Sequence, residues 1–163
     1  MAIKSKQQSG MSLSGLLIAM AIITTALIYL LGIINFSFKA FVEKEHFYQA
    51  GFMAQEAMEA TRSFRDSTNW SSDGLGTVNL LTSYHFEQSG SPSAWVLVSG
   101  EEVLDRFTRK VIFYEVRRDP DGNIILSGGG VDINSKRAKV IVSWQESGVL
   151  ESVEFESYFT NWQ

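Results

Sequence analysis

The chain has 163 residues, a formal net charge of -4, no cysteine and a mean hydropathy of +0.00. The absence of cysteine excludes a disulfide scaffold, a thiolate zinc site, a cysteine nucleophile and a lipid-modified lipoprotein cysteine. The acidic balance argues against nucleic acid as a main partner, because phosphate binding depends on clustered basic side chains and the sequence has no such cluster.

The hydropathy average hides an uneven distribution of charge. Only Lys4 and Lys6 precede Lys39, so residues 7–38 form a 32-residue window without a charged side chain. Within Met11–Ile34, 20 of 24 residues are apolar or glycine, and a helix of that length spans a hydrocarbon core of about 30 Å. The exceptions carry hydroxyls that can bond back to carbonyls of their own helix, and they are Ser12, Ser14, Thr24 and Thr25. The sequence therefore joins a bilayer-compatible segment to a water-compatible domain.

The charges that flank this segment predict its orientation. Lys4 and Lys6 precede it, whereas Lys39 is soon outnumbered by Glu43 and Glu45. Positively charged flanks stay in the cytoplasm, so the amino terminus is expected there and the bulk of the chain is expected to be exported. The predicted location is a single-pass position in the inner (cytoplasmic) membrane.

Three interpretations of the apolar segment compete. A cleaved signal peptide needs a small-x-small site after an apolar core, but Ala19-Met20-Ala21 has only the short core Leu16-Leu17-Ile18 before it. An uncleaved signal anchor accounts for the charges and the length without further assumptions. The third interpretation comes from the residues that precede the apolar run.

These residues form a short basic leader that ends in Gly10 and is followed by Met11, a hydroxyl residue and Leu13, where the apolar helix begins at once. The pattern resembles the type III signal of the type IV pilin and type II secretion pseudopilin family. In that family a prepilin peptidase cuts after the glycine and methylates the new terminal amine. The resemblance thus implies cleavage between Gly10 and Met11, with N-methylation of Met11. Glycine suits such a site because it lacks a Cβ and leaves the peptide bond unhindered.

The resemblance also implies partners and a position in an assembly. The partners would be prepilin peptidase, other pilin or pseudopilin subunits, the inner-membrane assembly platform and the lipid bilayer, with a pilus or pseudopilus as the final location. Most members carry Glu at the fifth mature position, where it neutralises the terminal ammonium of a neighbour inside the membrane, but this chain has Gly15. Because Gly15 has no carboxylate, the contact with the terminal ammonium cannot form in the usual way, and an unpaired charge in hydrocarbon costs on the order of several kcal/mol. Family members without this Glu include the pseudopilus tip subunit, which points to a special position such as the tip.

Two glycines of the apolar segment have other interpretations. Gly15 also fits a packing glycine that lets another membrane helix approach closely. Gly32 stands where major pilins often have proline, so a bend is allowed there and is not imposed.

The helix is predicted to continue beyond the membrane to about Phe64, which gives 54 residues from Met11 and a length of roughly 80 Å. Spacings of three and four define one apolar stripe along it, made of Val42, His46, Ala50, Met53, Ala57, Ala60 and Phe64. A second stripe lies roughly 100° away and contains Phe41, Tyr48 and Phe52. We expect one stripe to pack on the protein's own sheet and the other on neighbouring subunits.

The end of this helix carries a second, less specific resemblance. Residues 54–62 resemble the Ala-Gln-Glu-x-x-Glu-x-x-Arg helix end of PilV-like minor pilins and I-type pseudopilins. From the residues alone, Glu56 and Glu59 are predicted to form a solvated face with weak ion pairs to Arg62. Arg65 and Asp66 are predicted to mark the helix terminus and its turn.

Beyond Trp70 the pattern changes to short β segments separated by turns rich in Gly and Ser. The expected strands are Ser93–Ser99, Phe107–Arg117, Asn123–Ser127, Ala138–Gln145 and Val149–Phe159. In the last of these, Val153 and Phe155 are expected to face inward, with Glu154 and Glu156 outward. The predicted fold is α+β, a long amino-terminal helix with a transmembrane half and an amphipathic half, packed on an antiparallel sheet of four or five strands as in pilins.

The sequence predicts four regions in the chain. Residues 1–10 are the leader, residues 11–35 the transmembrane and filament-core helix, residues 36–70 the amphipathic helix with its exit turn, and residues 71–163 the β domain.

The sequence contains no recognisable catalytic motif, and no enzyme is predicted. His46 and His85 have no acidic neighbours at ligand spacing, and His46 is expected at the boundary of the core. Asp119, Asp121 and Asn123 have oxygen-donor spacing, but Gly122 precedes the third donor, so a hairpin turn is favoured over a calcium loop and no cofactor is expected. In that case Asp132 could serve only as a remote extra ligand.

The resemblance implies that the protein is a minor pilin or pseudopilin, a structural subunit of a type IV pilus or type II secretion pseudopilus. The alternative is a membrane-anchored surface binding module whose loops, such as Ser127–Ser135, bind DNA, a host surface or exported cargo. An enzyme on a signal anchor is a distant third interpretation.

Overall fold

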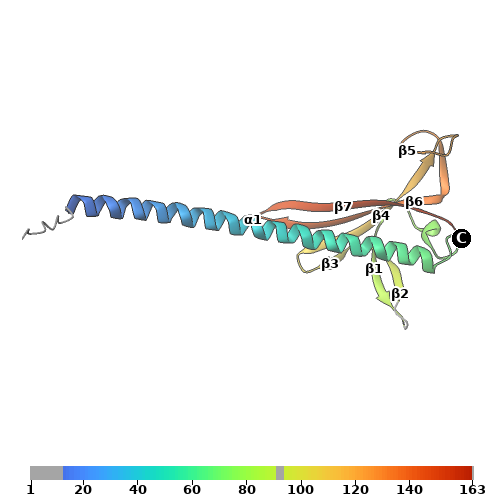
Figure 1. Cartoon of the computed structure of the whole chain (residues 1–163). Helices are drawn as coiled ribbons and strands as arrows, with labels where there is room; N and C mark the ends of the chain where they lie inside the picture. The colour runs from blue at the N-terminus through green and yellow to red at the C-terminus, as the bar shows by residue number, and fades with distance from the viewer. Residues whose placement is uncertain (1–12, 91–93, 163) are drawn as a thin grey trace, which may run out of the picture. The chain divides into compact units, whose positions relative to one another are not determined.

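The computed structural model of the chain describes residues 13–90 and 94–162, so that Lys4, Lys6, Gly10 and Met11 lie outside the described residues. Within the described ranges it contains one α-helix, one 3-10 helix and seven strands (Figure 1). These elements are α1 (Leu13–Ser67), η1 (Leu75–Thr77), β1 (Ser83–Ser89), β2 (Ala94–Ser99), β3 (Glu102–Leu104), β4 (Phe107–Arg118), β5 (Ile124–Ile125), β6 (Gly130–Glu146) and β7 (Val149–Thr160). The chain divides into two units, residues 1–44 and residues 45–163, and α1 contributes to both.

The α+β prediction, with a long helix and an antiparallel sheet, is confirmed, but four or five strands are too few. The sheet has seven strands in the order β2-β1-β4-β6-β7, with β3 and β5 pairing with β4 off that path. Strand β1 was not predicted because its sequence is largely polar. Strand β3 was not predicted because three residues are too few to show the alternation of a strand. Strand β6 begins at Gly130 instead of the predicted Ala138. The prediction missed its first half because that half is polar and lacks alternation.

Strands β4, β6 and β7 form the long central part of the sheet. The β4–β6 ladder runs from Phe107 opposite Trp144 to Arg118 opposite Gly130, with a bulge between Glu115 and Val116. The β6–β7 ladder runs without interruption from Glu146 opposite Val149 to Ser135 opposite Thr160. Strand β7 is one edge of the sheet and β2 is the other.

The core of the second unit lies between one face of this sheet and the later part of α1. Alternate residues of β4 and β6 face the helix, so that Phe113 and Val140 are completely buried. The helix meets them with Ala50, Ala54 and Ala60, each exposed by 1% or less. The side chains on this face of the helix are small, and the large side chains of the strands fill the core.

Of the two predicted stripes, the structure buries the one from His46 to Phe64, called the inner stripe below, although Met53 is only half-buried. The buried face is wider than that stripe, because Ala54, Met58 and Thr61 belong to it as well. The buried hydroxyl of Thr61 donates to the Ala57 carbonyl over 2.8 Å, so its polarity costs little.

The burial of one residue in β7 differs from the prediction. Val153 is buried as expected, whereas Phe155 on the same face is 39% exposed. Because β7 is an edge strand, it has a neighbouring strand on one side only. The outward orientation of Glu154 and Glu156 is confirmed, since both carboxylates pair with Lys139.

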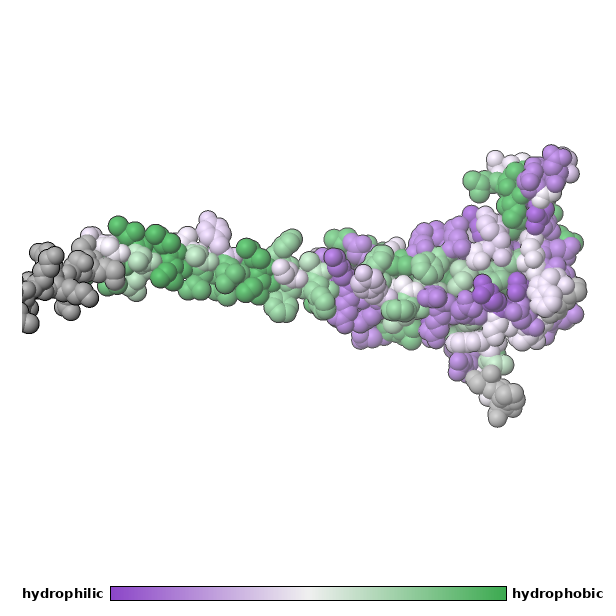
Figure 2. All heavy atoms as spheres, viewed as in Figure 1, coloured by the Kyte–Doolittle hydropathy of each residue, from purple (hydrophilic) through white to green (hydrophobic). Residues whose placement is uncertain are grey.

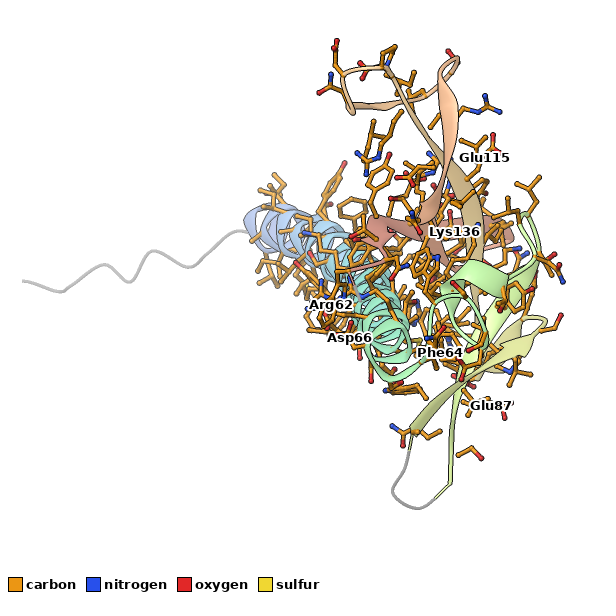
Figure 3. The ribbon with its side chains drawn as sticks, turned by 90° about the vertical axis from the view of Figure 1, so that its right-hand side faces the viewer. Arg62, Phe64, Asp66, Glu87, Glu115 and Lys136 are labelled. Carbon is orange, nitrogen blue, oxygen red and sulfur yellow. The ribbon has the colours of Figure 1, made fainter. Side chains whose placement is uncertain are left out.

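The helix ends at Ser67, three residues beyond the predicted end. There the Phe64 carbonyl accepts hydrogen bonds from the Thr68 amide at 3.1 Å and from the Thr68 hydroxyl at 2.6 Å. These bonds satisfy a carbonyl that the ending helix would otherwise leave without a partner. Figure 3 shows Phe64 on the side of the helix that faces the strands, with Arg62 and Asp66 on the opposite side.

Candidate functional site

The first unit presents an uninterrupted apolar helical surface. Leu17, Ile22 and Ile28 are 61%, 64% and 65% exposed, and the most apolar 18-residue window of α1 has a mean hydropathy of 2.6 with none of its residues buried. Figure 2 shows this surface as almost wholly hydrophobic, whereas the second unit has a mixed surface. A soluble protein rarely exposes so large an apolar area, so lipid or protein must cover it. By length and composition the helix can cross a membrane as a single-pass anchor.

Polar groups within this apolar segment are satisfied locally. The Thr24 hydroxyl donates to the Met20 carbonyl at 2.7 Å, and the Thr25 hydroxyl donates to the Ala21 carbonyl at 2.8 Å. The predicted back-bonding is therefore confirmed at both threonines. Such bonds allow a hydroxyl to lie in hydrocarbon without an unpaired donor. Gly15 and Gly32 both lie within α1, and a Cβ added at Gly32 would meet no atom within 4 Å.

The second predicted stripe is exposed. Phe41, in the first unit, is 67% exposed, and Tyr48 and Phe52, in the second, are 64% and 71% exposed. Val42, predicted to share the stripe of His46, is 42% exposed and belongs to the first unit. Aromatic side chains carry much of the binding energy of protein interfaces, so Tyr48 and Phe52 of the second unit, called the aromatic stripe below, are a candidate contact surface.

A buried arginine joins the helix to the sheet. Arg109 of β4 is 5% exposed, and its guanidinium donates to Glu102 Oε2 at 2.6 Å and 2.9 Å, to Glu56 Oε2 at 2.9 Å and to the Met53 carbonyl at 3.2 Å. The predicted pairing of Glu56 with Arg62 is therefore wrong, whereas Glu59 does pair with Arg62 at 3.1 Å. A signal for this network was present in the sequence, because an arginine at an inward position of β4 requires an acidic partner.

His46 is buried, as expected for a residue at the boundary of the core, and it belongs to a second polar cluster that the sequence did not predict. Its Nδ1 lies 2.5 Å from Glu146 Oε2, its Nε2 lies 2.7 Å from Arg106 Nη1, and its ring packs edge-on to Phe107. The ring thus lies between a carboxylate on its Nδ1 side and a guanidinium on its Nε2 side. With both ring nitrogens engaged, His46 anchors the helix to the sheet and is not arranged as a metal ligand.

Arg65 has a role that the sequence did not predict. Its guanidinium pairs with Asp66 at 2.7 Å, and its Cζ lies 5.5 Å from the ring centroid of Phe159 and 5.9 Å from that of Trp162. This cation–π stack ties the last turn of the helix to the end of β7.

The predicted turn at Asp119 is confirmed. Asp119 Oδ1 accepts from the Asn123 amide at 2.8 Å, and Oδ2 accepts from the Asn123 side chain at 3.0 Å. The side-chain hydrogen bond from Asn123 is the main reason that the pKa of Asp119 lies below its ordinary value. Asp132 has its own partners, Arg118 at 2.7 Å and Ser135 at 2.7 Å, and lies apart from any ligand set. Over residues 13–90 and 94–162, no three His, Cys, Asp or Glu side chains are grouped to hold a metal ion.

No family model, curated protein or solved structure matches this chain.

Proposed function

We propose that the chain is a minor pilin or pseudopilin, a structural subunit of a type IV pilus or a type II secretion pseudopilus. Prepilin peptidase would cut it after Gly10, and its helix would then pass from the membrane into the filament. The fold, one amino-terminal helix on an antiparallel sheet, agrees with a pilin-like architecture. The proposal rests on the leader motif together with the helix that follows it.

The observation that carries the proposal is the change of environment along α1. Its residues 13–38 bear no charge and are almost all exposed, whereas from His46 to Phe64 the same element supplies one wall of a packed core. A plain anchor needs only the apolar part, with a flexible link to the soluble domain. A filament subunit needs the helix to serve the bilayer, the filament interior and its own domain in turn, and the aromatic stripe offers a surface for neighbouring subunits.

The test of processing is mass spectrometry of the membrane-extracted protein. The proposal predicts a mature chain that starts at N-methylated Met11, and a Gly10→Val variant that keeps its leader. The matched control is Gly15→Val, a glycine of α1 away from the cleaved bond, which should be processed normally. An intact Met1 in the wild type, or a terminus beyond Ile34, would contradict the proposal.

The position in the filament is tested at the fifth mature residue. Gly15 has no carboxylate to neutralise the terminal ammonium of a neighbouring subunit. The wild-type chain is therefore expected at the tip. Gly15→Glu should move it into the shaft or change the length of the pilus, as seen by electron microscopy with immunogold labelling. An unchanged position and length would count against the tip assignment.

A membrane-anchored binding module is the second candidate function. The observation that favours it is an apolar groove beside β5 in the second unit.

A further inference from the structure

Strand β4 has an opening along one of its edges. Its other edge pairs with β6 throughout, but on this edge β1 pairs with Val111 and Ile112, and β5 pairs with Arg117 and Arg118. Within the described part of the chain no strand pairs with residues 113–116 on this edge, and the backbone contact there is Leu81 N–H donating to the Phe113 carbonyl at 2.9 Å. Alternate residues direct their peptide groups to the same edge, so the Glu115 peptide faces the opening between β1 and β5.

An apolar groove of about 450 Å³ lies over this opening. Its walls include Leu81 and Leu126, which are 73% and 87% exposed, together with Ile124 of β5, and its lining also includes Tyr114 and Tyr158. In Figure 3, Glu115 lies at the base of the β5 arm, the projecting segment that carries β5 and includes Ile124 to Leu126. The groove has the size of a site for a short peptide or a small ligand.

Arg137 provides a cation in this groove. Tyr114, Arg137 and Tyr158 form a cross-strand row on β4, β6 and β7, and the Arg137 Cζ lies 4.6 Å from the Tyr114 ring centroid. Arg137 forms an ion pair with Glu156, but the distance from Nη1 to Oε2 is 3.6 Å, beyond hydrogen-bonding distance, and Nε is buried without a hydrogen-bond partner. The other cation of the lining, Arg117, is paired with Glu115 at 2.7 Å. The groove therefore offers an incompletely used guanidinium that matches a carboxylate.

Leu81 adds an independent observation. Its φ is 60°, in the left-handed region where glycine is favoured, and its side chain is largely exposed. The side chain thus adds little to the core while the backbone is strained. Residues held in sparsely populated backbone conformations cluster at active sites and ligand clamps.

We propose that this groove binds an extended peptide segment of another protein, which adds a short strand between β1 and β5. Its backbone pairs with the Glu115 peptide, an apolar side chain lies between Leu81 and Leu126, and a carboxylate two residues away pairs with Arg137. The guanidinium already lies over Tyr114 of β4, so the carboxylate has about one strand spacing, about 4.8 Å, to cross. Another protein is the source because the exposed apolar–acidic segment Val149–Glu151 of this chain is already paired in the β6–β7 hairpin. This inference is independent of leader cleavage and of filament assembly.

The test uses the full chain in detergent micelles and a fluorescein-labelled hexapeptide, Thr-Leu-Thr-Glu-Thr-Val, with binding followed by fluorescence anisotropy. Replacing Leu81 by Gly should weaken binding about tenfold while the melting temperature stays constant or rises, because glycine relieves the strain. Leu126→Ser should weaken binding about fivefold, whereas Val103→Ser, at another exposed position on β3, should not change it.

Two altered peptides separate the parts of the proposed contact. Glutamine in place of the glutamate should weaken binding about fivefold through the loss of the Arg137 pair, and proline in place of the central threonine should abolish the strand pairing. No binding of the parent peptide up to about 1 mM, or equal binding by Leu81→Gly and the wild type, would overturn the proposal. Crosslinking of Leu126 to Val149–Glu151 of a second copy would overturn the assignment to another protein.

Discussion

The two parts of α1 use the same secondary structure in opposite ways. In residues 13–38 the large aliphatic side chains are exposed, and Ile22 and Ile28 have no core to fill. In residues 45–67 the helix turns alanines toward the sheet, and the large side chains of the core, such as Phe113, come from the strands. The difference shows that side-chain volume and charge pattern, and not helix propensity, determine which environment each part of the helix fits.

The largest expected effect comes from placing a charge in the first part. A lysine near the centre of a membrane helix costs about 2.5–3.5 kcal/mol of insertion free energy, so Ile23→Lys should shift the protein from the membrane fraction to the soluble or degraded fraction. The matched substitution Gln55→Lys lies at an exposed position of the second part and should leave the distribution unchanged. Quantitative immunoblotting of fractionated cells measures both, and equal membrane retention of the two variants would remove the distinction between the parts.

A second prediction compares the replacement of one alanine by leucine in each of the two parts of α1. Ala54 is completely buried against the sheet, so Ala54→Leu should overpack the core and lower the free energy of unfolding of the second unit by about 1–3 kcal/mol. Ala26 is exposed in the first unit, and Ala26→Leu should leave that unfolding free energy unchanged. Urea titration in detergent, followed by tryptophan fluorescence, measures the two values. A loss of stability at Ala26, or none at Ala54, would be inconsistent with the described core.

The smallest effect concerns pH and belongs to the second unit alone. The hydrogen bond from Arg118, with a further one from Ser135, lowers the pKa of Asp132 below its ordinary value of 3.8. A lowered carboxyl pKa stabilises the fold above the ordinary value, and that stabilisation is lost as the pH falls through the lowered value. The urea midpoint should therefore drop between about pH 6 and about pH 3, and the drop should be smaller in Asp132→Asn. Asp121→Asn, an exposed aspartate of the turn before β5, should show the wild-type drop.

The inner stripe of the helix could be predicted because a period of 3.6 residues marks one buried face. The charge-free window likewise predicted the exposed apolar part of α1, whereas the alternation of β7 predicted the burial of Val153 but not the exposure of Phe155. The ionic contacts could not be predicted in the same way, since Glu56 and Arg109 are 53 positions apart and meet only after the helix and sheet pack. Strand β1 shows the limit for local pattern, because its polar residues form a strand through pairing with β2 and β4.

The groove shows the same limit. Leu80 and Leu81 precede β1, Ile124 to Leu126 form the β5 arm, and Arg137 lies within β6, so the lining is assembled from segments that are distant in sequence. The sequence marked the turn at Asp119 and the glycines that follow, but it held no sign of the opening beside Glu115. An opening of this kind depends on where neighbouring strands stop pairing, which is a property of the sheet as a whole.

The central claim is that the aromatic stripe contacts other subunits while the inner stripe of the helix packs on the sheet. Site-specific photo-crosslinking in intact cells tests it most directly, with a photoreactive phenylalanine placed at Phe52. Val103 on β3 has the same exposed fraction, 71%, and serves as the matched control. The account predicts that the probe at Phe52 captures the helix of another pilin-like subunit and that the probe at Val103 does not. Capture from neither position, or equal capture from both, would contradict the assignment of this stripe as the assembly surface.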